Sequence, residues 1–255
     1  MKPRSNPNLT LRFMLACSLF GSLISLLIAV HSPTTTQDYF CQKLFVGSTF
    51  LLICALGSFT SLSPRKCSNV HETKIDMALI SSDVKTGLPV SSEGHHPDCG
   101  RFSAHIIRFR GHSYCAACTG LLIGGFIAII ITSLYFFFRL NAGPFGFPAV
   151  LAGQLGLVSG LMQFKLKSWA RSAANVLFVL GSSLMLIGID QLVGSMVIDI
   201  YIIGLIVLWI LTRVMISQWD HRRICLSCGF SCATERRVRI LPSPVAQPVK
   251  CTDDD

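Results

Sequence analysis

The chain has 255 residues, of which 51% are hydrophobic and only 14% are charged, and its formal net charge is +9. Apolar runs of about 20 residues, the length that crosses a bilayer, recur along it. This composition excludes a soluble enzyme. The positive charge must be interpreted from its distribution before it is taken as a sign of nucleic-acid binding.

The first apolar run extends from Leu11 to Val30, and three basic residues lie before it or at its start, Lys2, Arg4 and Arg12. It is longer than the apolar region of a secretory signal peptide, so we interpret it as an uncleaved first membrane helix. A second run, from Leu44 to Leu62, completes an N-terminal hairpin over residues 1–63. Prolines and charges then accumulate without a helical or strand period, which indicates a cytosolic linker at residues 64–92.

Four further apolar runs predict a four-helix core within residues 93–234; they are Leu121–Phe138, Phe147–Met162, Ala173–Asp190 and Met196–Val214. Residues 235–255 are basic, then rich in proline, then acidic, which is typical of a disordered tail. The predicted fold class is therefore an all-α integral membrane protein with about six transmembrane helices, an N-terminal hairpin plus a four-helix core.

The basic residues are distributed unequally between the predicted spans. Twenty of the 22 Lys and Arg residues fall in segments that six spans place on one side, and only Lys43 and Arg139 fall on the other. Because basic residues are retained on the cytosolic side, both termini are expected in the cytosol and the location is the cell (plasma or inner) membrane. No base-reading motif or aromatic stacking platform is evident, so the expected partners are the lipid bilayer and a metal ion, without nucleic acid.

Small residues recur at every fourth position in two spans, which favours close approach of helix backbones; they are Gly120, Gly124 and Ala128, and Ala152, Gly156 and Gly160. Polar residues in or near the spans are Gln154, Asn175, Asp190 and Asp199. Asp190 and Asp199 flank the short turn between the last two spans, so we expect them at the interface. The alternative is a polar pathway through the bundle.

Two groups of cysteine and histidine residues flank the core. The first contains the pair Cys115-x-x-Cys118 and is preceded by His95, His96, Cys99, His105 and His112. The second contains the pair Cys225-x-x-Cys228, with His221 and Cys232 nearby. Four predicted spans separate the two pairs, an even number, so both are expected on the cytosolic face. In a reducing compartment, clustered cysteines are more often metal ligands or redox-active thiols than structural disulfides.

Two CxxC pairs together supply the four soft ligands of a tetrahedral zinc ion. We therefore predict a composite metal site, with structural zinc as its expected ion, formed by Cys115, Cys118, Cys225 and Cys228. The nearest additional ligands are Cys99, His95, His96 and Cys232. An iron–sulfur cluster is a possible occupant of the same four cysteines.

Some of these candidates have other interpretations. His221, Cys225, Cys228 and Cys232 recur along one stripe of a helix, and an unbroken helix would separate the first and last by roughly 16 Å. His105 and His112 flank two arginines, so a solvated face or a contact with acidic lipid explains them as well as metal binding does.

The segment Cys115-Ala116-Ala117-Cys118-Thr119-Gly120 resembles the Cys-Ala-x-Cys-Thr-Gly signature of an uncharacterised group of small prokaryotic integral membrane proteins. Asp190-Gln191, near a turn between later spans, is also similar to that group. The resemblance covers residues 95–215 at most. It departs from the usual pattern at Ala117, which replaces a commonly basic residue, and at residues 96–99, which replace a Cys-His pair. The resemblance implies a membrane location and a His/Cys site, and it supplies no substrate.

The expected function is that of an integral membrane protein with a composite cytosolic His/Cys metal site and a binding, sensing or assembly role. One alternative is a metal-ion transporter that uses the site for delivery, with Asp190 along its path. Another is a membrane thiol oxidoreductase, because Cys115 and Cys118 precede a helix whose dipole favours thiolates. No nucleotide-binding loop, nucleophile elbow or zinc-protease helix is present, so ATPase, hydrolase and protease activities are not expected.

Overall fold

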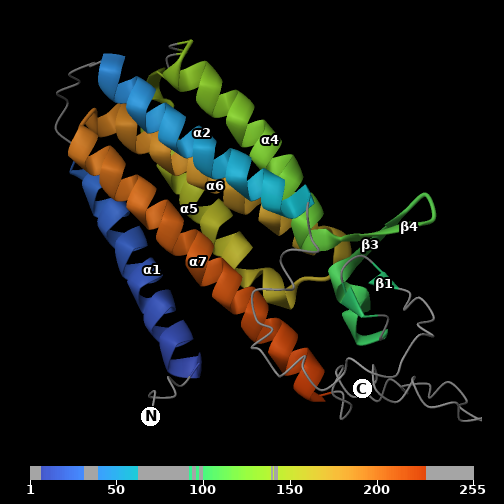
Figure 1. The fold of residues 1–255 in the computed structure, drawn as a ribbon. Coiled ribbons are helices and arrows are strands. Elements are labelled where there is room, and N and C mark those ends of the chain that lie inside the picture. The colour runs from blue at the N-terminus through green and yellow to red at the C-terminus, as the bar shows by residue number, and fades with distance from the viewer. Residues whose placement is uncertain are drawn as a thin grey trace, which may run out of the picture.

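The computed structural model describes residues 7–31, 40–62, 92–93, 96–97, 100–138, 140 and 143–227. This part is mostly helical (Figure 1) and contains six helices long and apolar enough to cross a membrane, as the sequence predicted. They are α1 (Pro7–Val30), α2 (Phe40–Leu62), α4 (Ala116–Phe136), α5 (Gly146–Leu161), α6 (Ser168–Val193) and α7 (Met196–Ser227).

The helices run alternately up and down the bundle, so α1 begins and α7 ends at the same end (Figure 1). Helix α6 lies at the centre and packs against α4, α5 and α7, while α2 packs on α4 and α1 packs on α7. The two N-terminal helices thus cover different parts of the core. Their outward side chains are large and apolar, as Phe20 and Phe59 illustrate, and such faces suit contact with lipid.

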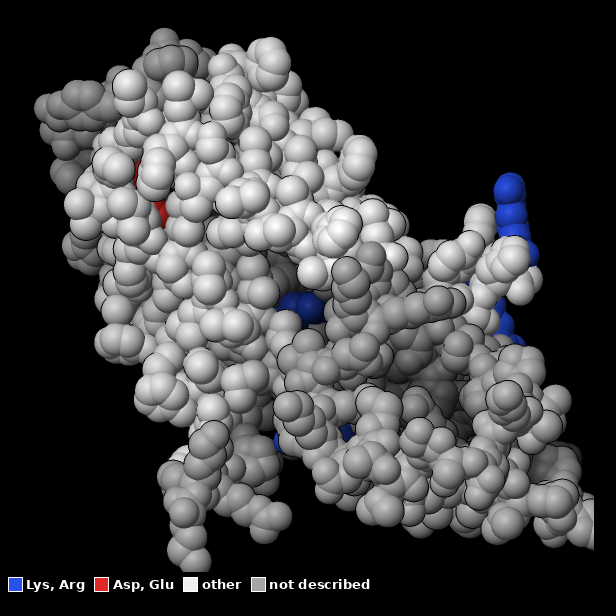
Figure 2. Space-filling view, viewed as in Figure 1, with Lys and Arg blue, Asp and Glu red and all other residues white. Residues whose placement is uncertain are grey.

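Figure 2 shows that this face of the bundle is almost entirely without charged side chains, and that basic side chains project to one side of it. These basic groups occupy the position of a small hairpin formed by β3 (Ile106–Phe109) and β4 (His112–Cys115). The uncharged surface follows from the helix composition, because charged groups are costly in hydrocarbon.

Close contacts between helices depend on the predicted small residues. A Cβ atom at Gly120 would lie 2.3 Å from the carbonyl oxygen of Ser172, and one at Gly156 would lie 2.5 Å from that of Leu177. Only glycine therefore allows α4 and α5 to approach α6 this closely. Ala152 differs from the prediction, because it is exposed and the neighbouring Gly153 faces α6 instead.

The region before α4 contains strands that the sequence did not predict. Ser92–Glu93 (β1) pairs with His96–Pro97 (β2), and β3 pairs with β4 after the 3-10 helix Gly100–His105 (η3). Phe109 pairs with His112, which leaves the two-residue turn Arg110–Gly111 with positive φ angles of 49° and 79°. Turns of this kind match the twist of two antiparallel strands. The fold is therefore helical with two short hairpins, not purely α.

Several helices extend beyond the apolar runs. Helix α4 begins at Ala116 where the hydropathy predicted Leu121, α6 begins at Ser168 where it predicted Ala173, and α7 continues to Ser227 beyond the predicted end at Val214. A search for apolar runs misses these turns because they contain polar and charged residues. Three of the extensions lie at one end of the bundle, where α4 begins and α7 ends (Figure 1). We call it the thiol end, after Cys115 and Cys118.

Candidate functional site

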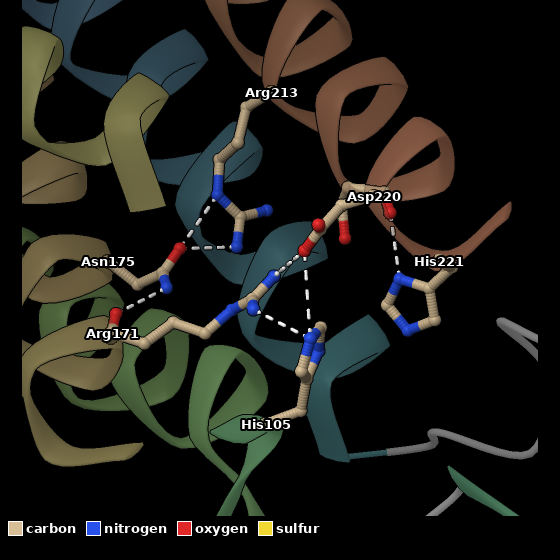
Figure 3. Close-up of polar contacts among 7 residues, drawn as sticks. His105, Arg171, Asn175, Arg213, Asp220 and His221 are labelled. Carbon is tan, nitrogen blue, oxygen red and sulfur yellow. Dashed lines mark hydrogen bonds and ion pairs between the residues drawn. The ribbon is translucent and has the colours of Figure 1, made fainter. Parts of the chain in front are cut away.

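A buried ionic network joins three segments at the thiol end (Figure 3). Arg171 on α6 donates from Nη2 to Oδ2 of Asp220 on α7 over 3.0 Å, and from Nη1 to Nε2 of His105 over 2.9 Å. None of these residues is more than 4% exposed. Because an arginine only donates, Nε2 of His105 is the acceptor, so this imidazole is neutral and carries its proton on Nδ1.

A second arginine on α7 extends the network. Arg213 donates from both Nε and Nη2 to Oδ1 of Asn175, and Nδ2 of Asn175 donates to the backbone carbonyl of Arg171 over 2.7 Å (Figure 3). Asn175 lies one turn after Arg171 on α6, and Arg213 lies about two turns before Asp220 on α7. The facing sides of α6 and α7 therefore each contribute an arginine and the acceptor for the arginine of the other helix.

The first thiol pair lies beside Arg213. Cys115 ends β4 and occupies the N-cap position of α4, and Cys118 lies in the first turn of that helix. Both cysteines lie near enough to the Arg213 guanidinium for a thiolate at either position to interact with it. Gly120 permits this arrangement, because its missing side chain lets the first turns of α4 approach Asn175 on α6. A helix N-terminus and a nearby cation both favour the thiolate form of cysteine.

The charges of the described network do not balance without the thiols. It contains two buried guanidinium groups, Arg171 and Arg213, and one carboxylate, Asp220. The acceptor that the described residues provide for Arg213 is the neutral amide of Asn175. A buried cation without a counter-charge is strongly unfavourable. One thiolate in the Cys115–Cys118 pair would neutralise the excess charge.

His221 connects the end of α7 to the same network. Its ring lies edge-on to that of His105, with 5.2 Å between the centroids. Its Nδ1 lies 2.7 Å from the backbone carbonyl of Ser217, to which it donates in the neutral ring. In that tautomer Nε2 carries the lone pair, the arrangement found in metal-binding histidines.

The structure places some of the predicted ligands and leaves others outside its described part. Cys115 and Cys118 lie at the same end of the bundle as the last turns of α7, as the even number of spans predicted (Figure 1). Cys225 follows His221 by one turn of the continuous helix α7, and His96 lies in β2. The structure describes only the backbone of these two residues. The remaining candidates lie outside the described residues; they are His95, Cys99, Cys228 and Cys232.

Within residues 7–31, 40–62 and the described parts of 92–227, no group of three or more His, Cys, Asp or Glu residues is arranged to hold a metal ion. Only two of the eight predicted ligands have described side chains, so the composite site stays a prediction. The sequence left metal binding, a solvated face and a lipid contact open for His105 and His112. In the structure His105 belongs to the buried network, and His112 is exposed on the β3–β4 hairpin.

Sequence reasoning missed the charged members of this site. It counted Arg171 and Arg213 as cytosolic loop charges and gave Asp220 no role. One signal was present: Arg213 and Asp220 are seven residues apart, and Arg171 and Asn175 are four apart. Both spacings place two residues on one face of a helix.

Comparisons of this chain with protein-family models, with curated proteins and with solved structures found no match. The function must therefore be argued from the site itself, and the resemblance of the Cys115–Gly120 segment to a group of prokaryotic membrane proteins remains a hypothesis.

Proposed function

We propose that this chain is a six-span protein of the cell membrane, with both termini in the cytosol, that binds one structural zinc ion at the thiol end. Cys115 and Cys118 would supply two ligands from the start of α4, and Cys225 and Cys228 would supply two from the end of α7. Zinc at this position would tie the segment before the core to the segment after it, and it suits a binding, sensing or assembly role.

One observation carries the proposal. The His105–His221 ring contact joins the segment that leads into the first thiol pair to the last turns of α7. Cys225 follows His221 by one helical turn on the same helix. The chain between His105 and Cys115 is a short paired hairpin, so its path to α4 is restricted. The two thiol pairs, which are more than a hundred residues apart in sequence, thus begin from adjoining segments.

The electrostatics of the described residues also favour this chemistry. Zinc binds thiolates and not thiols, so a site must offset the cost of deprotonating its cysteines. The buried Arg213 guanidinium offsets this cost for Cys115 and Cys118, beside which it lies. The ion pair between Arg171 and Asp220 holds α6 and α7 together at this end of the bundle.

Metal analysis of the purified full-length protein tests the proposal. We expect one zinc per chain in the wild type and loss of that zinc in both Cys115→Ser and Cys225→Ser, because each change removes one ligand from a different half of the site. Cys41→Ser is the matched control, since Cys41 is exposed at the start of α2, at the opposite end of the bundle, and should leave the zinc content unchanged.

Two results would contradict the zinc proposal. Zinc retained at wild-type stoichiometry in Cys225→Ser would show that α7 does not contribute to the site. A wild-type protein that contains no metal after purification without chelators would refute zinc binding altogether.

The electrostatic contact between Arg213 and Cys118 supports a second candidate, a membrane thiol oxidoreductase. A stabilised thiolate would attack the disulfide of a substrate and form a mixed disulfide. The other cysteine of the Cys115–Cys118 pair would then displace the substrate, which leaves with two thiols while the pair becomes a disulfide. Trapping with alkylating reagents decides this case: metal-free protein should reduce oxidised glutathione with its dithiol, and Cys115→Ser should accumulate a mixed disulfide with glutathione. Exchange that is unaffected by Cys115→Ser would exclude it.

A further inference from the structure

Two aspartates lie at the end of the bundle opposite the thiol end, beside the turn between α6 and α7. Asp190 is 3% exposed and Asp199 is fully buried. Both side chains point into the protein, and their expected position at the membrane interface stays a prediction. Acidic atoms show on the surface near this turn only as small areas between uncharged neighbours (Figure 2).

Helices α2 and α4 supply the groups around this pair, whose members lie on α6 and α7. Oδ2 of Asp190 accepts a hydrogen bond of 2.7 Å from the Tyr135 hydroxyl on α4 and lies 3.8 Å from Nζ of Lys43 on α2. Oδ2 of Asp199 accepts a hydrogen bond of 3.0 Å from Nε2 of Gln42, also on α2. Each aspartate has thus used one oxygen for a neighbour on another helix.

The other oxygens of the pair are buried. Neither Oδ1 of Asp190 nor Oδ1 of Asp199 has a hydrogen-bond partner among the described residues. Gln42 and Lys43, which contact one carboxyl group each, are consecutive residues of α2, so the two carboxyl groups lie close together. Two ionised carboxylates offer only acceptors, so a hydrogen bond between them requires a proton. Like charges this close in a buried site also cannot both remain ionised.

The charges around the pair also indicate one bound proton. Lys43 and Tyr135 are the titratable groups that face the pair among the described residues of α2 and α4. Tyr135 is a neutral donor, so Lys43 provides a single positive charge. Two ionised aspartates would leave a buried net charge of −1, whereas a pair that holds one proton balances Lys43.

We propose that Asp190 and Asp199 form a proton-binding site, in which the two carboxyl groups together hold one proton at neutral pH. A metal cation does not suit this position, because the Lys43 ammonium faces the same carboxyl groups and Gln42 and Tyr135 donate hydrogen bonds to them. The site is separate from the proposed zinc site. Its loss of a proton would place two like charges between α6 and α7 and weaken the contacts of both helices at this end.

Infrared difference spectroscopy of the full-length protein in lipid nanodiscs tests this site, because a protonated carboxyl group has its own C=O stretching band. We expect this band at pH 7 in the wild type and its loss in Asp199→Asn, in which Asp190 keeps Lys43 as a partner and is ionised. Asp220 is the other described buried acid, and its ion pair with Arg171 keeps it ionised in both proteins. Absence of the band in the wild type, or its persistence in Asp199→Asn, would overturn the proposal.

A second variant keeps the test decisive even where Asp199→Asn does not fold. Lys43→Gln removes the cation that favours the ionised pair while it keeps a polar side chain of similar length. The carboxyl band should then persist to a pH about one unit higher than in the wild type, or more. A band that titrates at the same pH in both proteins would show that the proton is not held by this pair.

Discussion

Arg171 and Asp220 form an ion pair inside the bundle, with 3.0 Å between Nη2 and Oδ2, although they belong to different helices and lie 49 residues apart. The pair fixes α6 against α7 at the end where α4 begins. Arg171 also donates from Nη1 to Nε2 of His105 over 2.9 Å, so the segment before the β3–β4 hairpin is held at the same point. The thiol end is therefore built on a polar core.

Removal of one partner of this ion pair should destabilise the protein strongly. In Arg171→Ala the Asp220 carboxylate loses its buried counter-charge, and a cost of about 3–5 kcal/mol is typical of such a change. Thermal unfolding in detergent, followed by the tryptophan signal, measures it. Arg222→Ala is the control, because Arg222 is exposed on the same helix as Asp220 and should unfold like the wild type. Equal unfolding temperatures for Arg171→Ala and Arg222→Ala would refute the structural role of the pair.

Asn175 offers a way to test whether a thiolate balances the charge of Arg213. In Asn175→Asp the new carboxylate would accept the same two hydrogen bonds and supply the missing negative charge, although it would lose the hydrogen bond that Nδ2 donates to Arg171. The Arg213 charge would then stabilise the thiolate forms of Cys115 and Cys118 less. Alkylation of Cys118 at neutral pH should therefore slow about tenfold. The rate is measured by mass spectrometry on protein treated with a chelator. Asn175→Ala, which adds no charge, should not slow the reaction, and equal rates in the two variants would contradict the charge argument.

The sequence predicted the architecture well because membrane spans obey one strong rule, the apolar run, and that rule places all six helices. It failed where other forces act. The strand pairing around Arg110–Gly111 depends on backbone angles that no hydrophobic period reveals. The polar extensions of α6 and α7 are stabilised by contacts between distant residues, such as Arg171 and Asp220, which only the packed structure brings together.

The same limit applies to the candidate site. The number of spans was enough to predict at which end of the bundle Cys115 and Cys118 lie, and their spacing marked them as a pair. Both features can be read directly from the sequence. The nearby guanidinium group was not predictable, since Arg213 lies near the end of an apolar run and was interpreted as a topology signal. Its partner Asn175 was noted only as an isolated polar residue.

The close contact between α4 and α6 predicts the effect of a single methyl group. In Gly120→Ala the added Cβ would lie 2.3 Å from the carbonyl oxygen of Ser172, so α4 must move away from α6. We expect a destabilisation of about 1–3 kcal/mol, the usual range for overpacking, and a weaker electrostatic contact between Cys118 and Arg213. Gly204→Ala is the control, because a Cβ at Gly204 meets no atom within 4 Å. The unfolding temperatures of the two variants measure this effect. An equally large decrease in Gly204→Ala would show that the contact between Gly120 and Ser172 is not the cause.

The proposed orientation in the membrane predicts which residues a reagent can reach from outside the cell. Cys41 lies at the start of α2, at the end of the bundle opposite the thiol end, and His112 lies on the exposed β3–β4 hairpin. Both positions are exposed, so the membrane and not burial should determine their labelling. In intact cells that express His112→Cys, a membrane-impermeant maleimide should label Cys41 and leave position 112 unlabelled, and permeabilised cells should show both labels.

Mass spectrometry of the labelled peptides gives the two yields from the same sample, so each position serves as the control for the other. The basic residues favour this result, since all but two of them belong to the segments assigned to the cytosol. Labelling of position 112 in intact cells, with Cys41 protected, would reverse the orientation. The thiol end would then face an oxidising compartment, where Cys115 and Cys118 would be expected to form disulfides and the argument for zinc would fail.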